Sequence, residues 1–252
     1  MIKNTLRLAV CVLLLVNASA WAVDKDALRK AISGPDRDPA DFFRDGSRKP
    51  VEVLDFLAIE SGMRVLDVYA AGGYYTFILA KAVGPEGRVF AQNTPRGLEY
   101  EEDRQEISQG DALEAKLQAG SLGNVTHLIE PMAELSIEPG SLDAVMVVQI
   151  LHDYYNPAPE RALQLLTQLY ALLKPGGIVG IIDHVGEAGR ENRRFHRMEK
   201  QQAIDVALQA GFLLVADSDL LHNPGDRHVR SIFDPMLSRN TDRFLLKLQK
   251  PD

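Results

Sequence analysis

The sequence has almost no cysteine, and this shortage limits the chemistry that the protein can perform. Cys11 is the only cysteine among 252 residues, so no disulfide can form within the chain. It also lies in an N-terminal segment that we expect to be removed. Cysteine nucleophiles and thiolate metal sites are therefore excluded from the mature protein, and the lack of thiols suits an oxidising compartment.

The sequence also lacks an apolar run long enough to span a bilayer, which requires roughly 20 residues. Instead, Lys3 and Arg7 precede a short apolar run at residues 8–16, and small residues follow, with Ala20 and Ala22 at possible cleavage positions. This layout predicts a Sec-type signal peptide at residues 1–22. We expect cleavage near Ala22, a periplasmic or secreted protein, and no stable membrane insertion afterwards. Cleavage after Ala20 and an uncleaved membrane anchor are the alternatives.

Positively charged residues are also few relative to negatively charged ones. The chain has 28 Lys and Arg against 35 Asp and Glu, a net charge of −7, which becomes −9 without Lys3 and Arg7 of the leader. Proteins that bind nucleic acids usually carry a basic face. We therefore expect a small-molecule substrate and no nucleic-acid partner, while the oligomeric state is left open. The acidic cluster at residues 99–103 is interpreted as a solvated helix face.

The chain alternates between helix-like and strand-like segments and shows no internal repeat. Residues 23–49 are polar and are predicted to form a helical arm or lid before one domain at residues 50–252. Predicted strands lie at residues 63–69, 88–93, 124–129, 142–149, 178–183, 212–216 and 242–248. Predicted helices lie at residues 50–60, 74–83, 96–118, 159–173 and 198–209. The pattern predicts an α/β fold with a doubly wound, mostly parallel, seven-stranded, Rossmann-like sheet whose last strand is antiparallel.

A tight glycine turn follows the first predicted strand. Gly72 and Gly73 allow the backbone to approach a ligand closely, and a helix that begins at Tyr74 would point its free N–H groups toward that ligand. In an open α/β sheet, ligands bind beyond the carboxyl ends of the parallel strands, where the strand order reverses. The position of this turn therefore predicts that the ligand-binding site lies at the same edge of the sheet.

Three motifs in the order of these elements resemble class I S-adenosylmethionine (SAM) methyltransferases. They read VLDVYAAGG at residues 65–73, GSLDAV at 140–145 and LLKPGG at 172–177. The first resembles the acidic residue and G-x-G-x-G turn that cradle SAM, with Tyr69 and Ala71 at the first two glycine positions and Gly73 at the third. The run GGYYT at residues 72–76 is similar to a branch of predicted bacterial methyltransferases, many of them exported.

The resemblance implies SAM as the cofactor and indicates which residues would contact it. Gln92 and Asn93 are the candidates at the end of the second strand, where the family has an acidic residue that holds the ribose. Met132 lies in the adenine-contacting region, where Pro131 replaces a common Asp. The implied cofactor-binding residues are Asp67, Tyr69, Ala71, Gly72, Gly73, Tyr74, Asn93, Met132 and Gln149.

The methyl acceptor is expected beside residues that follow the fourth and fifth strands. The candidate catalytic residues are His152, Asp153, Tyr155, Asp183 and His184. His184 could act as a base if Asp183 orients it, and a structural, hydrogen-bonded histidine is the alternative. The long connection at residues 217–241 is expected to return to the same edge and to form part of the site.

Three functional hypotheses remain open at this point. The preferred one is SAM-dependent methyl transfer to a small molecule, with no metal required. The second is an exported, non-catalytic module that keeps the fold and binds another small ligand, because SAM is made in the cytoplasm and cannot accompany an unfolded Sec substrate. The third is a metal-assisted hydrolase or isomerase that uses Asp153, Asp183 and His184 as an oxygen-rich metal site.

Overall fold

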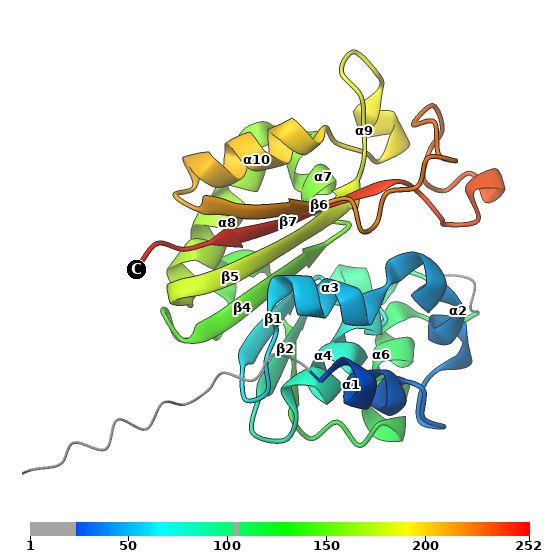
Figure 1. The fold of residues 1–252 in the computed structure, drawn as a ribbon, viewed down its shortest axis with the longest axis vertical. Coiled ribbons are helices and arrows are strands. Elements are labelled where there is room, and N and C mark those ends of the chain that lie inside the picture. Colours follow the sequence, from blue (N-terminus) through cyan, green and yellow to red (C-terminus); the bar gives the residue numbers. More distant parts are fainter. Residues whose placement is uncertain (1–23, 103–105) are drawn as a thin grey trace, which may run out of the picture.

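The computed structural model describes residues 24–102 and 106–252 as helices packed on both faces of one twisted sheet (Figure 1). The predicted signal peptide lies outside these residues. The seven strands are β1 (Arg64–Val68), β2 (Arg88–Asn93), β3 (Val125–Ile129), β4 (Leu142–Val148), β5 (Leu173–His184), β6 (Leu213–Ser218) and β7 (Arg243–Gln249). Their order in the sheet is β3-β2-β1-β4-β5-β7-β6. Only β7 runs antiparallel to its neighbours, so the predicted fold is confirmed.

The helices divide between the two faces of the sheet (Figure 1). One face is covered by α1 (Lys25–Ile32), α3 (Pro50–Leu57), α4 (Tyr74–Val83) and α6 (Gln109–Ala119). The other is covered by α7 (Leu151–Tyr155), α8 (Pro159–Leu172) and α10 (Lys200–Gln209). Two clusters of buried apolar side chains fill these layers, one on each face. This two-sided burial explains the uniformly apolar central strands.

Short elements occupy the connections at the carboxyl edge. They are α2 (Pro39–Arg48), α5 (Pro95–Leu98), α9 (Asn192–Phe195) and the 3-10 turns Met132–Glu134 and Pro235–Leu237. The predicted arm at residues 23–49 contains α1 and α2, and Lys81 of α4 binds Asp36 between them at 2.6 Å. No helix within residues 24–102 and 106–252 combines the length and the apolar character needed to cross a membrane.

Two predicted elements differ from the structure. The helix expected at residues 96–118 is divided into α5 and α6, because residues 99–102 leave the helical path and Glu102 turns inward to a position that is 5% exposed. Within the described part of the acidic cluster, Glu99 and Glu101 are exposed but Glu102 is buried, so residues 99–102 do not form a solvated helix face. The strand expected at residues 178–183 is longer, since β5 begins at Leu173 and includes the residues predicted to form a turn after α8.

Close packing of α3 on β5 gives a first testable prediction. A side chain at Gly180 would collide with Leu57, which is fully buried. We expect Gly180→Ala to lower the free energy of unfolding by roughly 1–3 kcal/mol, because the core must shift to admit the methyl group. Urea denaturation measures this loss. Gly123→Ala is the control, since no atom lies within 4 Å of the added carbon, and an equal loss in both variants would contradict the packing argument.

Candidate active site

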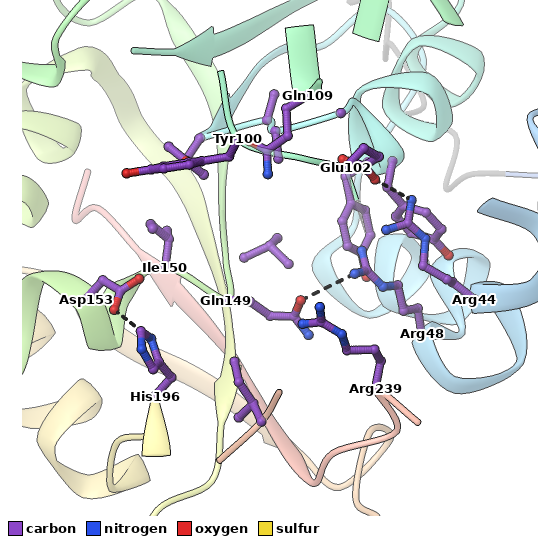
Figure 2. A pocket seen from close by; sticks show the side chains of 18 of the residues that line it. Arg44, Arg48, Tyr100, Glu102, Gln109, Gln149, Ile150, Asp153, His196 and Arg239 are labelled. Carbon is purple, nitrogen blue, oxygen red and sulfur yellow. Dashed lines mark hydrogen bonds and ion pairs between the residues drawn. The ribbon is translucent and has the colours of Figure 1, made fainter. Parts of the chain in front are cut away.

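A cavity of about 560 Å³ opens at the carboxyl ends of β1 and β4. These adjacent strands are where the strand order reverses, which is the expected ligand position in this type of sheet. The volume falls within the roughly 300–1,000 Å³ of small-molecule sites. Its walls come from the turn after β1, the start of α7, helix α2 and the loop before β7, so segments far apart in sequence meet there (Figure 2).

The turn after β1 has the backbone of a glycine turn although two of its key residues are not glycine. Tyr69, Ala71 and Gly73 have φ angles of 52°, 50° and 83°, all in the left-handed region. Glycine adopts this region freely, whereas each non-glycine residue there costs roughly 1–2 kcal/mol. These are the three positions at which the sequence motif places glycine. The turn therefore keeps the expected shape despite its altered sequence.

Two amides at the end of β2 hold this strained turn in place. The Tyr69 N–H donates to Gln92 Oε1 at 3.0 Å, and the Ala71 N–H donates to Asn93 Oδ1 at 2.9 Å. The Tyr69 ring lies against Gly97, where a side chain would collide with it. Both Tyr69 and Tyr74 border the cavity without filling it, so the turn opens onto accessible space.

Asp67 lies at the end of β1 and lines the cavity. Its side chain is 3% exposed, and Thr76 Oγ1 donates to its Oδ2 at 2.7 Å. Burial raises the pKa of Asp67 from its ordinary value near 3.8 to about 7, although the hydrogen bonds from Thr76 and the charge of Arg48 act in the opposite direction. The cavity therefore contains a carboxyl group that changes charge near neutral pH.

Helix α2 closes one side of the cavity with two arginines that sequence reasoning missed. Arg48 donates to Gln149 Oε1 at 3.4 Å, and Arg44 donates to Glu102 at 3.0 Å (Figure 2). Arg48 also lies 4.4 Å from the centre of the Tyr74 ring, whose hydroxyl donates to Asp45 of α2 at 2.6 Å. Tyr74 therefore anchors the arm as well as bordering the cavity. In the sequence, the four-residue spacing of Arg44 and Arg48 could have indicated that both lie on one helix face.

On the opposite side, His152 faces the cavity and Asp183 lies behind it. Asp183 accepts hydrogen bonds from the His152 backbone N–H at 2.9 Å and from His152 Nδ1 at 2.7 Å. Burial favours neutral His152, but the charge and hydrogen bond of Asp183 prevail and raise the His152 pKa above its ordinary value. Asp183 thus fixes the ring so that the buried Nε2 lies 3.3 Å from Asp153 Oδ1.

Several residues proposed from the sequence do not line this cavity. Asn93 is fully buried, and its amide is occupied by the Ala71 backbone, so the structure assigns it to the turn rather than to direct ribose contact. Met132 packs in the apolar core, and Gly73 lies behind the turn against Leu113. Tyr155 borders a separate groove between α8 and α10.

His184 is also placed away from the cavity. Its Nδ1 lies 2.7 Å from Thr241 Oγ1, and burial lowers its pKa well below the ordinary value. The structure therefore supports the alternative of a structural histidine, because the His184 ring contacts Thr241 while Asp183 contacts the ring of His152. The predicted site residues that do line the cavity are Asp67, Tyr69, Ala71, Gly72, Tyr74, Gln149, His152 and Asp153.

The predicted long loop does return to the cavity. Phe233 and Arg239 from this loop and His196 after α9 contribute to its wall. The His196 ring packs against Phe233 with 4.9 Å between ring centres and lies 3.2 Å from Asp153 through Nδ1 (Figure 2). Tyr100 and Glu102 also line the cavity and were missed, because they lie in the unexpected break between α5 and α6.

Comparison with known proteins agrees with this architecture. Demethylmenaquinone methyltransferase of Lactococcus lactis is 32% identical over 123 residues, which cover 49% of this chain and 42% of the relative. Arsenite methyltransferase of Halobacterium salinarum is 31% identical over 134 residues, which cover 53% of this chain and 30% of the relative. The chain thus matches less than half the length of either relative.

Solved structures with low sequence identity share the fold. A SAM-dependent methyltransferase from Aquifex aeolicus superimposes with a TM-score of 0.61 at 18% identity, covering 90% of this chain and 98% of the other. The [4+2]-cyclase SpnF gives the same TM-score and identity, covering 90% and 92%. A family described as a methyltransferase domain matches residues 59–231. The chain therefore belongs to this methyltransferase-domain family, within the class I SAM-dependent methyltransferase superfamily.

Proposed function

We propose that the protein transfers a methyl group from SAM to a small molecule held in the cavity beyond β1 and β4. The observation that carries this proposal is the turn at residues 69–73, whose left-handed backbone opens onto a cavity of about 560 Å³. Membership of the methyltransferase family supports the choice of cofactor. Fold alone would not support it, since a cyclase has a similar structure.

The cavity offers complementary groups to the charges of SAM, which carries a sulfonium, an ammonium and a carboxylate. The turn backbone allows close approach, and the Asp67 carboxyl group supplies negative charge when ionised. Arg48, beside Gln149, supplies a guanidinium for a carboxylate. Methyl transfer from a sulfonium is an in-line displacement, so alignment of the two reactants within the cavity supplies much of the rate.

We place the acceptor on the side of the cavity formed by His152, Asp153, His196 and Phe233. Asp153 and His196 lie across the cavity from Arg44 and Arg48 of α2 (Figure 2), and together with the Phe233 ring they combine polar atoms with an aromatic surface. The names of the two curated relatives refer to a quinone precursor and to arsenite, both small molecules. The cavity volume of about 560 Å³ likewise suits a small acceptor.

The other two hypotheses receive less support. The comparisons do not favour a non-catalytic module, because the curated relatives are named methyltransferases. The sequence-derived metal trio of Asp153, Asp183 and His184 is not assembled, since Asp183 is bonded to His152 and His184 to Thr241. We retain the proposal that the protein is exported, on the basis of the charged and apolar pattern of residues 1–22.

Production of S-adenosylhomocysteine tests the proposed activity. Purified protein is incubated with SAM and a panel of quinols, phenols, thiols and arsenite, with and without each acceptor. We expect product formation above the acceptor-free rate for at least one class. Saturable SAM binding without acceptor-dependent product across the panel would favour a binding module instead.

The raised pKa of Asp67 predicts that SAM binding strengthens as pH rises from about 6 to 8. The cationic cofactor pairs with the carboxylate form, so protonation of Asp67 below about pH 7 opposes binding. Asp67→Asn should weaken binding at pH 8 by roughly tenfold, equivalent to about 1.4 kcal/mol, and remove most of the pH dependence. Calorimetric titration at several pH values measures both effects.

Folding stability should show the opposite dependence on pH. The pKa of Asp67 is higher in the folded protein than in the unfolded chain, so the folded state binds the proton more tightly, and this contribution is lost as pH rises from about 4 to 7. Asp67→Asn should therefore stabilise the ligand-free protein at pH 8, by roughly 1–3 kcal/mol. Asp55→Asn, at an exposed carboxylate, is the control. A lower free energy of unfolding for Asp67→Asn than for the unmodified protein at pH 8 would contradict the raised pKa of Asp67.

A further inference from the structure

Three side chains with metal-binding atoms converge on the acceptor side of the cavity. They are His152 and Asp153 of α7 and His196, which ends α9, and one atom from each lies within 4.8 Å of the others. Asp153 Oδ1 is 3.3 Å from His152 Nε2 and 3.2 Å from His196 Nδ1. Asp153 and His196 point toward each other in Figure 2.

The buried His152 ring has a nitrogen that the described residues leave without a hydrogen bond. Its side chain is 2% exposed, and no hydrogen-bond partner of Nε2 exists within residues 24–102 and 106–252. Asp183 Oδ1 accepts the hydrogen bond of His152 Nδ1, so Nδ1 carries the proton in that bond and the neutral ring has a lone pair on Nε2. This lone pair faces the Asp153 oxygen, and a cation between them would relieve their repulsion.

The spacing of the three atoms also suits one metal ion. Nitrogen and oxygen ligands at about 2.0–2.2 Å from zinc in tetrahedral geometry are separated by roughly 3.3–3.5 Å. The two separations at Asp153 Oδ1 are close to this range. Asp183 bonded to the far nitrogen of His152 matches the carboxylate that orients histidine ligands in metal sites.

The backbone and neighbours of His196 hold its ring in position. His196 has a φ of 54°, which is uncommon for a residue other than glycine and turns the chain sharply after α9. Phe233 packs against one side of the ring, and the His152 ring lies 5.6 Å away. Because strained residues of this kind cluster at functional sites, the conformation is consistent with a ligand role.

We propose that His152 Nε2, Asp153 Oδ1 and His196 Nδ1 bind a divalent transition-metal ion of the zinc and iron(II) class. Two imidazoles and one carboxylate suit these ions better than magnesium or calcium, which prefer oxygen ligands. Three protein ligands leave coordination positions open toward the cavity, as in catalytic rather than structural sites. The trio differs from the one considered from sequence, because only Asp153 belongs to both.

The role of this site in methyl transfer rests on the proposed function. An acceptor oxygen would bind at an open position of the ion and lose its proton to solvent. The oxygen lone pair then forms the bond to the methyl carbon. The carbon–sulfur bond breaks with its electron pair left on sulfur, which yields the methylated acceptor and neutral S-adenosylhomocysteine. Metal binding itself requires no SAM and can be measured separately.

Cobalt(II) titration tests the site directly, because four- and five-coordinate cobalt sites absorb in the visible range. The purified full chain is first treated with chelator and dialysed, then titrated with Co²⁺ and, in competition, Zn²⁺. We expect one equivalent to bind, with visible absorption that Zn²⁺ abolishes. His196→Ala and Asp153→Asn should each weaken binding by at least tenfold. Both side chains are partly exposed, so circular dichroism should show a retained fold.

His222→Ala is the matched control, since this histidine also contacts a carboxylate but lies outside the cavity. It should bind Co²⁺ like the unmodified chain. Absence of a saturable Co²⁺ spectrum, or equal weakening by His222→Ala and His196→Ala, would overturn the proposal. SAM binding without metal binding would refute the metal site and leave the proposed function standing. Metal binding without SAM binding would do the reverse.

Discussion

Replacing Arg197 with alanine is expected to lower the free energy of unfolding by roughly 3–5 kcal/mol. The Arg197 side chain is fully buried and binds both carboxylate oxygens of Asp226, at 3.0 and 2.9 Å. It also donates to the backbone oxygens of Val185 and Arg230, each at 3.0 Å. Truncation leaves the 4% exposed Asp226 charge without its cation, which is costlier than loss of a surface pair.

Urea denaturation gives the loss, and Arg194→Ala supplies a matched comparison. Arg194 forms an exposed pair with Glu191, so its removal should cost less than about 1 kcal/mol. Arg197→Ala should also impair ligand binding, because Arg197 follows His196 and joins β5 to the loop that brings Phe233 to the cavity. Similar unfolding free energies for the two variants would show that the buried pair does not hold this loop.

Substitution of Asp183 by alanine should have a comparable effect, at least 3 kcal/mol. Asp183 is fully buried and accepts from the backbone N–H groups of His152 and His184 and from His152 Nδ1, at 2.9, 2.7 and 2.7 Å. Each buried donor left without a partner costs roughly 1–3 kcal/mol. Asp183→Asn keeps one acceptor oxygen and should be less damaging than Asp183→Ala.

Loss of the Asp183 carboxylate should also impair function, because it no longer holds the His152 ring in one orientation. Without its carboxylate, Nε2 is no longer directed at Asp153, so methyl transfer and Co²⁺ binding should both fall by roughly 10- to 100-fold in Asp183→Asn. Thermal and urea unfolding measure stability beside these assays. Asp205→Ala, at an exposed carboxylate on α10, should change none of them. An Asp183→Asn protein with unmodified stability and Co²⁺ affinity would contradict the assigned role.

The fold could be predicted from the sequence because each of its elements is indicated by residues that are close together in the chain. Apolar strands, the glycine turn after β1 and the helical periodicity of α8 each determine an element without reference to distant residues. The order of elements then leaves few ways to arrange a parallel sheet. Asp67 and His152 were found for the same reason, since Asp67 lies near the end of β1 and His152 follows the end of the adjacent β4.

The rest of the site depends on contacts that local patterns do not encode. Arg48 reaches the cavity only because α2 docks through Tyr74 and Asp45, a contact between residues 29 positions apart. The contact of Asn93 with the turn could not be predicted, because the direction of its side chain depends on the strained backbone at Ala71. His196 enters through a left-handed residue after a four-residue helix, which no periodicity indicates.

We propose that SAM binds at the turn formed by residues 69–73, and calorimetric titration with SAM tests this directly. We compare the unmodified protein with two variants at Ala71, whose φ is 50°. Ala71→Gly should bind SAM within about threefold of the unmodified protein, because glycine accepts this conformation. Ala71→Val should bind at least tenfold more weakly, because a β-branched residue opposes it. Absence of saturable binding by the unmodified protein, or equal binding by Ala71→Val, would contradict the account.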